Sequence, residues 1–76
     1  MISLLQAEKN QEFKVERIEG GRNMRQRLCD LGVYEGARIR VLRADYGPVI
    51  IKVLDSKIAI GRGQAQRIIV SKVGDG

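Results

Sequence analysis

The sequence predicts a small, strongly bent β-barrel with short helices, and three observations lead to this fold class. Short segments of alternating apolar and polar residues, separated by turn residues, recur along the 76-residue chain. Aromatic residues are scarce and Trp is absent, so the core must be built from Ile, Val and Leu. A domain of about this size buries only about 60% of its unfolded surface, and closing a barrel removes most exposed strand edges. We expect one domain over residues 1–73, with a frayed C-terminus at residues 74–76.

The N-terminal part of the chain predicts a short helix followed by a strand. Ser3 can cap a helix from Leu4 to Ala7, which ends in a polar segment. Phe13, Val15 and the nearby Ile18 then form the apolar face of a first strand.

A basic helix is expected next, from about Arg22 to Leu31. Met24, Leu28 and Leu31 recur at helical spacing, so they form one narrow apolar stripe that can face a core. Gly32 stands where a left-handed C-terminal cap is wanted. The two glycines before the helix, Gly20 and Gly21, are too few for a phosphate-binding loop and indicate a tight strand-to-helix turn.

The rest of the chain predicts four further strands, at residues 37–43, 49–54, 57–60 and 68–70. Asp55 and Ser56 are of the right length for a hairpin turn, and Gln64 to Arg67 can make one helical turn. About five short strands are too few for a sizeable sandwich but enough for an SH3-like barrel. The basic helix would then cover one open end, with its apolar stripe filling that end.

The net charge of +5 favours an anionic partner, although the same charge also serves solubility and both interpretations stay open. Proteins that bind single-stranded nucleic acid usually interleave aromatic and basic residues. Phe13, Tyr34 and Tyr46 are the only aromatic residues, and none lies in a basic run. Nucleic acid is therefore not the favoured partner.

The residue types argue against an enzyme, a metal site or a cofactor site. There is no His, the commonest general base and metal ligand, and the carboxylates are dispersed. The single Cys29 is a poor iron site without other soft ligands, so we expect a semi-buried thiol at the rim of the helix. One cysteine excludes an intrachain disulfide, and no leader or long apolar run is visible, so the cytoplasm is the expected location.

The candidate partner-binding residues are Arg22, Arg25, Arg27 and Tyr34. The three arginines lie off the apolar stripe, and arginine forms paired hydrogen bonds to carboxylates. Tyr34 lies in the expected turn after the helix, and Tyr and Arg are enriched in interface hot spots. The alternatives are a merely solvated helix face and a tyrosine that packs over the barrel end. Asp30 is expected to pair with Arg27 or a nearby backbone amide.

Several segments, in order, resemble the FeoA family. They are Ser3-Leu4-Leu5, Ile18-Glu19-Gly20-Gly21, residues 24–32 (MRQRLCDLG), residues 36–41 (GARIRV), Gly47-Pro48, residues 58–65 (IAIGRGQA) and Ile68-Ile69-Val70. The resemblance covers nearly the whole chain. The turn before Gly36 often carries proline in this family and here reads Tyr34-Glu35, so partner contacts at this turn do not carry over.

This resemblance implies an SH3-like fold and a non-enzymatic cytosolic protein that acts on FeoB, the ferrous iron transporter with a cytosolic G-domain. Weak self-association, direct metal binding and the direction of the effect on transport stay open. One alternative is the SH3-like domain of iron-dependent repressors, which should follow a winged-helix region that this chain lacks. The other is a basic nucleic-acid-binding barrel, whose binding would fall steeply with salt.

Overall fold

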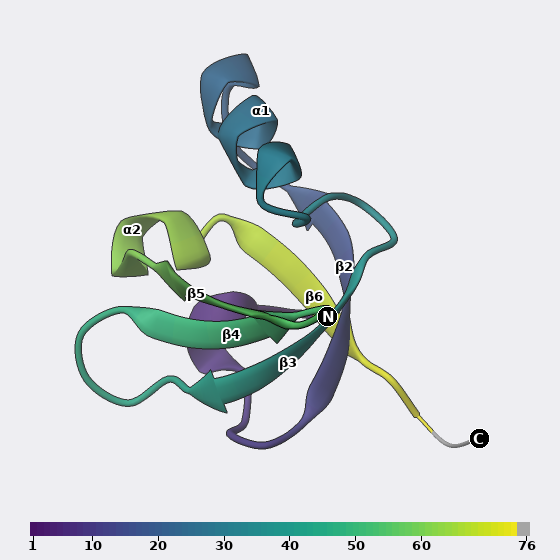
Figure 1. Ribbon diagram of the computed structural model, residues 1–76, viewed down its shortest axis with the longest axis vertical. Coiled ribbons are helices and arrows are strands. Elements are labelled where there is room, and N and C mark those ends of the chain that lie inside the picture. Colours follow the sequence, from purple (N-terminus) through teal and green to yellow (C-terminus); the bar gives the residue numbers. More distant parts are fainter. Residues whose placement is uncertain (75–76) are drawn as a thin grey trace.

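Six antiparallel strands, bent around an aliphatic core, make up the fold of residues 1–74, which the computed structural model describes (Figure 1). In chain order, the elements are β1 (Ile2–Ser3), the 3₁₀ helix η1 (Leu4–Gln6), β2 (Glu12–Ile18), α1 (Arg22–Asp30), β3 (Arg38–Arg43), β4 (Val49–Val53), β5 (Ser56–Ile60), α2 (Arg62–Ala65) and β6 (Ile68–Lys72). The strand order is β1-β6-β2-β3-β4-β5. This arrangement confirms the mainly β, SH3-like prediction. The two-residue β1 was missed because it is too short to show alternation.

Most of the core comes from the alternating inward positions of the strands, and the helices and loops add residues such as Leu4, Leu28 and Val33. In β2, β3 and β4, buried and exposed residues alternate as the sequence pattern predicts. Among the residues that the structure describes, Phe13 is the only aromatic side chain in a core otherwise made of Ile, Val, Leu and Ala. No polar or charged residue is buried within residues 1–74. Burial of apolar surface is therefore the main stabilising term.

Two β-bulges bend the sheet. In β2, the register against β6 shifts between Val15 and Arg17, and in β3 the register against β4 shifts between Val41 and Arg43. A bulge inserts one unpaired residue and increases the local twist. The two long central strands can therefore curve around a small core.

Helix α1 ends in the predicted left-handed turn. Gly32 has φ +96°, its N–H donates to the Cys29 carbonyl at 2.9 Å, and the Val33 N–H donates to the Leu28 carbonyl at 2.8 Å. These two bonds define a Schellman motif, and the accompanying apolar contact is supplied by the buried Leu28 and Val33. The chain thus reverses direction immediately after the helix.

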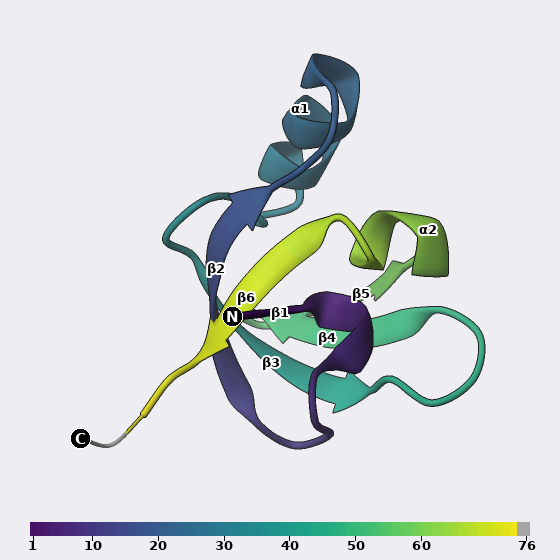
Figure 2. The ribbon, with the colours of Figure 1, turned by 180° about the vertical axis from the view of Figure 1, so that it is seen from behind.

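That reversal explains why the prediction for Leu31 was wrong. Leu28 is buried and Met24 packs against the core, but Leu31 is 47% exposed. The chain turns at Gly32, so Val33 enters the core where the helical spacing assigned Leu31. Figures 1 and 2, seen from opposite sides, show α1 standing beyond one end of the barrel. The helix covers this end through Met24 and Leu28 alone.

Three local predictions also need correction. Ser3 makes no side-chain capping bond, and the helix after it is a single 3₁₀ turn that ends at Gln6. The β4–β5 turn is formed by Leu54 and Asp55, because Val53 pairs with Ser56. Helix α2 runs from Arg62 to Ala65 rather than from Gln64 to Arg67, with Gly61 as its N-cap.

No helix within residues 1–74 has the length and apolar character needed to cross a bilayer. The predicted frayed end at 74–76 falls mostly on residues 75 and 76, which lie outside the described residues.

Candidate partner-binding groove

A groove of about 380 Å³ lies between α1 and the loop that follows it. Its lining residues are Ile18, Arg22, Arg25, Gln26, Cys29, Tyr34 and Glu35. The four helical residues are spaced i, i+3, i+4 and i+7, so they share one face of α1. Tyr34 and Glu35 come from the loop between α1 and β3, and Ile18 ends β2. We call this feature the α1 groove.

Local sequence fixes the orientation of the helix that lines this groove. A Cβ atom at Gly20 would overlap the Met24 sulfur, so a residue with a side chain at this position, where β2 turns into α1, would make the flexible end of Met24 move. Met24 can then pack against the core. Because Met24 faces inward, Arg22 and Arg25 are turned toward the groove.

The loop wall is held to the barrel by backbone hydrogen bonds. Gly36 has φ +94°, and its N–H donates to the Val15 carbonyl at 2.8 Å. The Ala37 N–H donates to the Tyr34 carbonyl at 2.9 Å. These bonds fix Tyr34 on a tight turn beside α1, where its side chain is 50% exposed.

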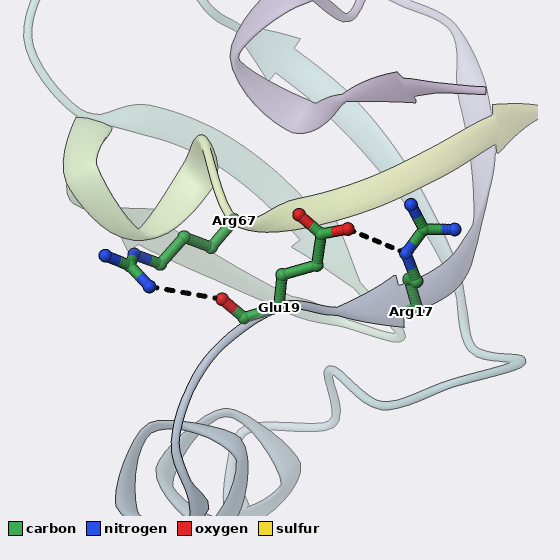
Figure 3. A network of polar contacts seen from close by, with 3 residues as sticks. All are labelled: Arg17, Glu19 and Arg67. Carbon is green, nitrogen blue, oxygen red and sulfur yellow. Dashed lines mark hydrogen bonds and ion pairs between the residues drawn. The ribbon is translucent and has the colours of Figure 1, made fainter.

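The strand that leads into α1 is joined to the far end of the sequence by a small polar network (Figure 3). The Glu19 N–H donates to the Arg67 carbonyl at 2.7 Å, and the Arg67 guanidinium donates to the Glu19 carbonyl at 3.3 Å. The Glu19 carboxylate accepts a hydrogen bond from Arg17 Nε at 2.8 Å. The β2–α1 junction is thereby attached to the α2–β6 junction.

The groove is basic, and its charges are uncompensated. Within residues 1–74, Arg22 and Arg25 make no side-chain hydrogen bond or ion pair, and Glu35 is the one acidic residue in the lining. The first turn of α1 carries no acidic residue, and its N-cap Gly21 makes no side-chain bond. Cations near a helix N-terminus interact unfavourably with the helix dipole. These arginines therefore do not stabilise the isolated domain.

The structure brings together three of the four residues predicted to bind a partner: Arg22, Arg25 and Tyr34 line the groove. Arg27 does not, because at about 100° per residue it lies about 150° around the helix from the centre of the groove face. Asp30 accepts a hydrogen bond from the Gln26 side-chain amide at 3.0 Å, rather than from Arg27 or a nearby backbone amide as expected.

Sequence reasoning missed four groove residues: Ile18, Gln26, Cys29 and Glu35. The prediction of a semi-buried Cys29 was wrong, since the thiol is exposed on the groove face. The helical spacing of Arg22, Arg25, Gln26 and Cys29 is the signal that could have identified this face.

The groove offers hydrogen-bond donors that suit carboxylates: two guanidinium groups, one side-chain amide and one phenol. Within residues 1–74, no group of three or more His, Cys, Asp or Glu side chains is placed to hold a metal ion. The groove is therefore an open surface whose donors suit an acidic group.

The fold and the groove define a small SH3-like domain with an open basic groove beside its first helix. A model of the FeoA domain matches residues 2–72, and the chain belongs to the FeoA family. It is 41% identical over 70 residues to a protein of Methanocaldococcus jannaschii provisionally named Fe(2+) transport protein A. That match covers 92% of this chain and 85% of the relative.

Solved structures agree with this assignment. An iron uptake regulatory protein (FeoA) has a TM-score of 0.86 at 39% identity, with 95% of this chain and 96% of that chain covered. FeoA from Chlorobium tepidum has a TM-score of 0.85 at 24% identity, with 99% and 73% covered. ScaR with bound Cd²⁺ has a TM-score of 0.86 at 23% identity, but this chain covers only 35% of it. The last two similarities concern the fold alone.

Proposed function

We propose that this protein is a non-enzymatic accessory protein of ferrous iron uptake that binds the cytosolic part of the transporter FeoB. Family membership and the names of the two relatives, an Fe(2+) transport protein and an iron uptake regulatory protein, support the process. The observation that carries the binding role is the convergence of Arg22, Arg25 and Tyr34 on one open groove.

The proposed mechanism is differential binding to two conformations of the transporter. A ligand shifts a conformational equilibrium only by the difference between its affinities for the two states. The α1 groove would bind acidic residues that are accessible in one state of FeoB and covered in the other. The hydrogen bond from the Gly36 N–H to the Val15 carbonyl holds the loop wall of the groove to the barrel, so this wall loses little conformational entropy on binding.

The arginines favour this role because binding relieves a cost that the free domain carries. Arg22 and Arg25 lie in the first turn of α1, where the helix dipole disfavours cations. Partner carboxylates would supply paired hydrogen bonds to the guanidinium groups and compensate the dipole. Tyr34, beside them and half exposed, adds contact area at low entropic cost.

Isothermal titration calorimetry with purified FeoB cytosolic part tests the proposal. The double variant Arg22→Glu/Arg25→Glu should weaken binding at least tenfold, since each buried charged contact contributes about 1–3 kcal/mol. Lys14→Glu/Arg38→Glu is the matched control, because it reverses the same number of charges at exposed residues of β2 and β3 that do not line the groove. Equal losses in the double variant and the control would show a non-specific charge effect and contradict the groove assignment.

Arg27 serves as a second discriminator on the same helix. It remains a predicted partner contact, but it lies outside the α1 groove. We expect Arg27→Glu to weaken FeoB binding less than Arg25→Glu does. A larger loss for Arg27 would move the docking surface to the other side of α1.

The repressor-domain alternative has no support beyond the fold. ScaR and a manganese-dependent transcriptional repressor share the barrel at 23% and 22% identity, which is too low to transfer a role.

A further inference from the structure

The tip of the β4–β5 hairpin has a backbone conformation that its residue type does not favour. Leu54 has φ +56° at the first central position of the turn, whereas Asp55 is not in the left-handed region. Positive φ at the first central residue alone is typical of a type II′ turn, which normally places Gly there. A branched side chain in this region is strained.

The same leucine gains nothing from burial to offset that strain. Its side chain is 88% exposed, so it contributes almost no hydrophobic stabilisation within the domain. A single exposed leucine is ordinary in proteins. An exposed leucine in a strained turn is different, because Gly or Asn would fold more easily at this position.

A second unfavourable feature lies at the second residue pair behind the tip, next to the Val53–Ser56 pair. Lys52 on β4 is directly opposite Lys57 on β5, and both are exposed. Like charges in directly opposed positions of an antiparallel pair destabilise the sheet. Neither lysine has an ion-pair partner within residues 1–74. The hairpin therefore combines an apolar tip with two adjacent unpaired cations.

The exposed Leu31 lies at the same end of the barrel. A Cβ atom on Gly32 would lie 2.9 Å from Val53 Cγ1, so the turn after α1 packs against the residue that precedes Leu54. Leu31 and Leu54, which are far apart in sequence and both exposed, thus flank the close approach between the turn after α1 and β4.

We infer that the β4–β5 hairpin is a second docking element, in which Leu54 enters an apolar pocket with an acidic rim on the protein partner. Acidic residues of the rim would compensate the positive charges of Lys52 and Lys57. The pocket would bury the side chain of the strained Leu54, which is exposed in the free domain. A protein pocket fits better than an anionic lipid surface, because the exposed Asp55 beside Leu54 would have to enter the headgroups. The inference rests on the proposed function, since FeoB is taken as the partner.

Two substitutions test this inference because each should separate stability from binding. Leu54→Gly removes the side chain and suits the turn, so the melting temperature should equal or exceed that of the wild type. Lys52→Glu converts the opposed lysines into an opposite-charge pair and should also leave the melting temperature equal or higher. Both variants should weaken binding of the FeoB cytosolic part at least fivefold. The control Tyr46→Ser, which changes another exposed residue in the β3–β4 loop, should change neither quantity.

The outcomes distinguish the two proposals. If the wild type binds the FeoB cytosolic part and Leu54→Gly binds it equally well, the hairpin inference is wrong and the proposed function still stands. No wild-type binding overturns both proposals. A binding loss accompanied by a lower melting temperature shows a structural role for Leu54 and overturns the inference. Two further experiments test other binding partners of Leu54. If the wild type floats with vesicles of anionic phospholipid, or self-associates in analytical ultracentrifugation, and Leu54→Gly does not, then Leu54 binds a membrane or a second copy of the chain. Either result overturns the hairpin inference.

Discussion

Glu19 and Arg67 are joined in both directions: the Glu19 N–H donates to the Arg67 carbonyl at 2.7 Å, and the Arg67 guanidinium donates to the Glu19 carbonyl at 3.3 Å (Figure 3). This pair joins the end of β2 to the start of β6, two segments that are neighbours only in the folded chain. It therefore fixes the point from which α1 leaves the barrel.

Removing the Arg67 side chain should loosen this junction. Arg67→Ala should lower the free energy of unfolding by about 0.5–1.5 kcal/mol, which is typical of one hydrogen bond. Glu19→Ala is the control and should cost less, because the Arg67 bond goes to the Glu19 backbone and the Arg17–Glu19 pair is exposed. Urea unfolding followed by circular dichroism measures both. A larger loss for Glu19→Ala would show that the carboxylate, rather than the backbone link, holds the junction.

The two positive-φ glycines that flank the groove loop offer a matched comparison. Gly32 and Gly36 have φ +96° and +94°, but only Gly32 has a side chain, that of Val53, where a Cβ would lie. Ala at either site carries the left-handed backbone penalty of about 1–2 kcal/mol. Gly32→Ala should cost at least about 1 kcal/mol more than Gly36→Ala, because Val53 must also move. Equal losses in urea unfolding would contradict the close approach of the Gly32 turn to β4.

The sequence predicted the barrel well because strand alternation is a local signal. The inward positions of β2, β3 and β4 follow directly from period-two patterning, and so does the aliphatic core. The glycine cap after α1 was likewise recognisable, since the αL position favours one residue type. These features need no knowledge of tertiary contacts.

Features that depend on tertiary contacts were not predictable in this way. Leu31 continued the helical stripe, yet the reversal at Gly32 gave its place in the core to Val33. The β4–β5 turn was expected one residue late, because Leu54 is a poor turn residue. One wall of the α1 groove, formed by Tyr34 and Glu35, comes from a loop folded back by the Val15–Gly36 bond, a contact that no local pattern encodes.

Reversing the charge of Arg22 should stabilise the domain while it weakens binding to FeoB. Arg22→Glu places an acid in the first turn of α1, where it interacts favourably with the helix dipole. The free energy of unfolding should rise by about 0.3–1 kcal/mol, while FeoB binding weakens. Thermal unfolding by calorimetry measures the first effect. A lower melting temperature would mean that Arg22 makes a stabilising contact within the domain.

At acidic pH, protonation of Asp45 should contribute to the fall in the free energy of unfolding. Hydrogen bonds from the backbone N–H groups of Asp45 and Tyr46, with a smaller effect of Arg43, hold the pKa of this carboxyl below its usual 3.8. A pKa lowered by folding stabilises the protein above the unfolded pKa, and that stability is lost as the pH falls through the folded pKa. NMR titration of the Asp45 carboxyl carbon should give a value below 3.8.

The variant Arg43→Gln sharpens this test. The two backbone donors remain in the variant, so the Asp45 pKa should stay below its usual value. A return to the usual value in Arg43→Gln would assign the shift to the ion pair, which spans 3.5 Å, instead of the backbone.

The central claim is that an open arginine groove beside α1 binds the cytosolic part of FeoB, and calorimetric titration of that part with wild type and Arg22→Glu/Arg25→Glu tests it most directly. We expect saturable binding by the wild type and at least a tenfold weaker affinity for the folded double variant. Absent binding by the wild type, or equal affinity for both proteins, would contradict it.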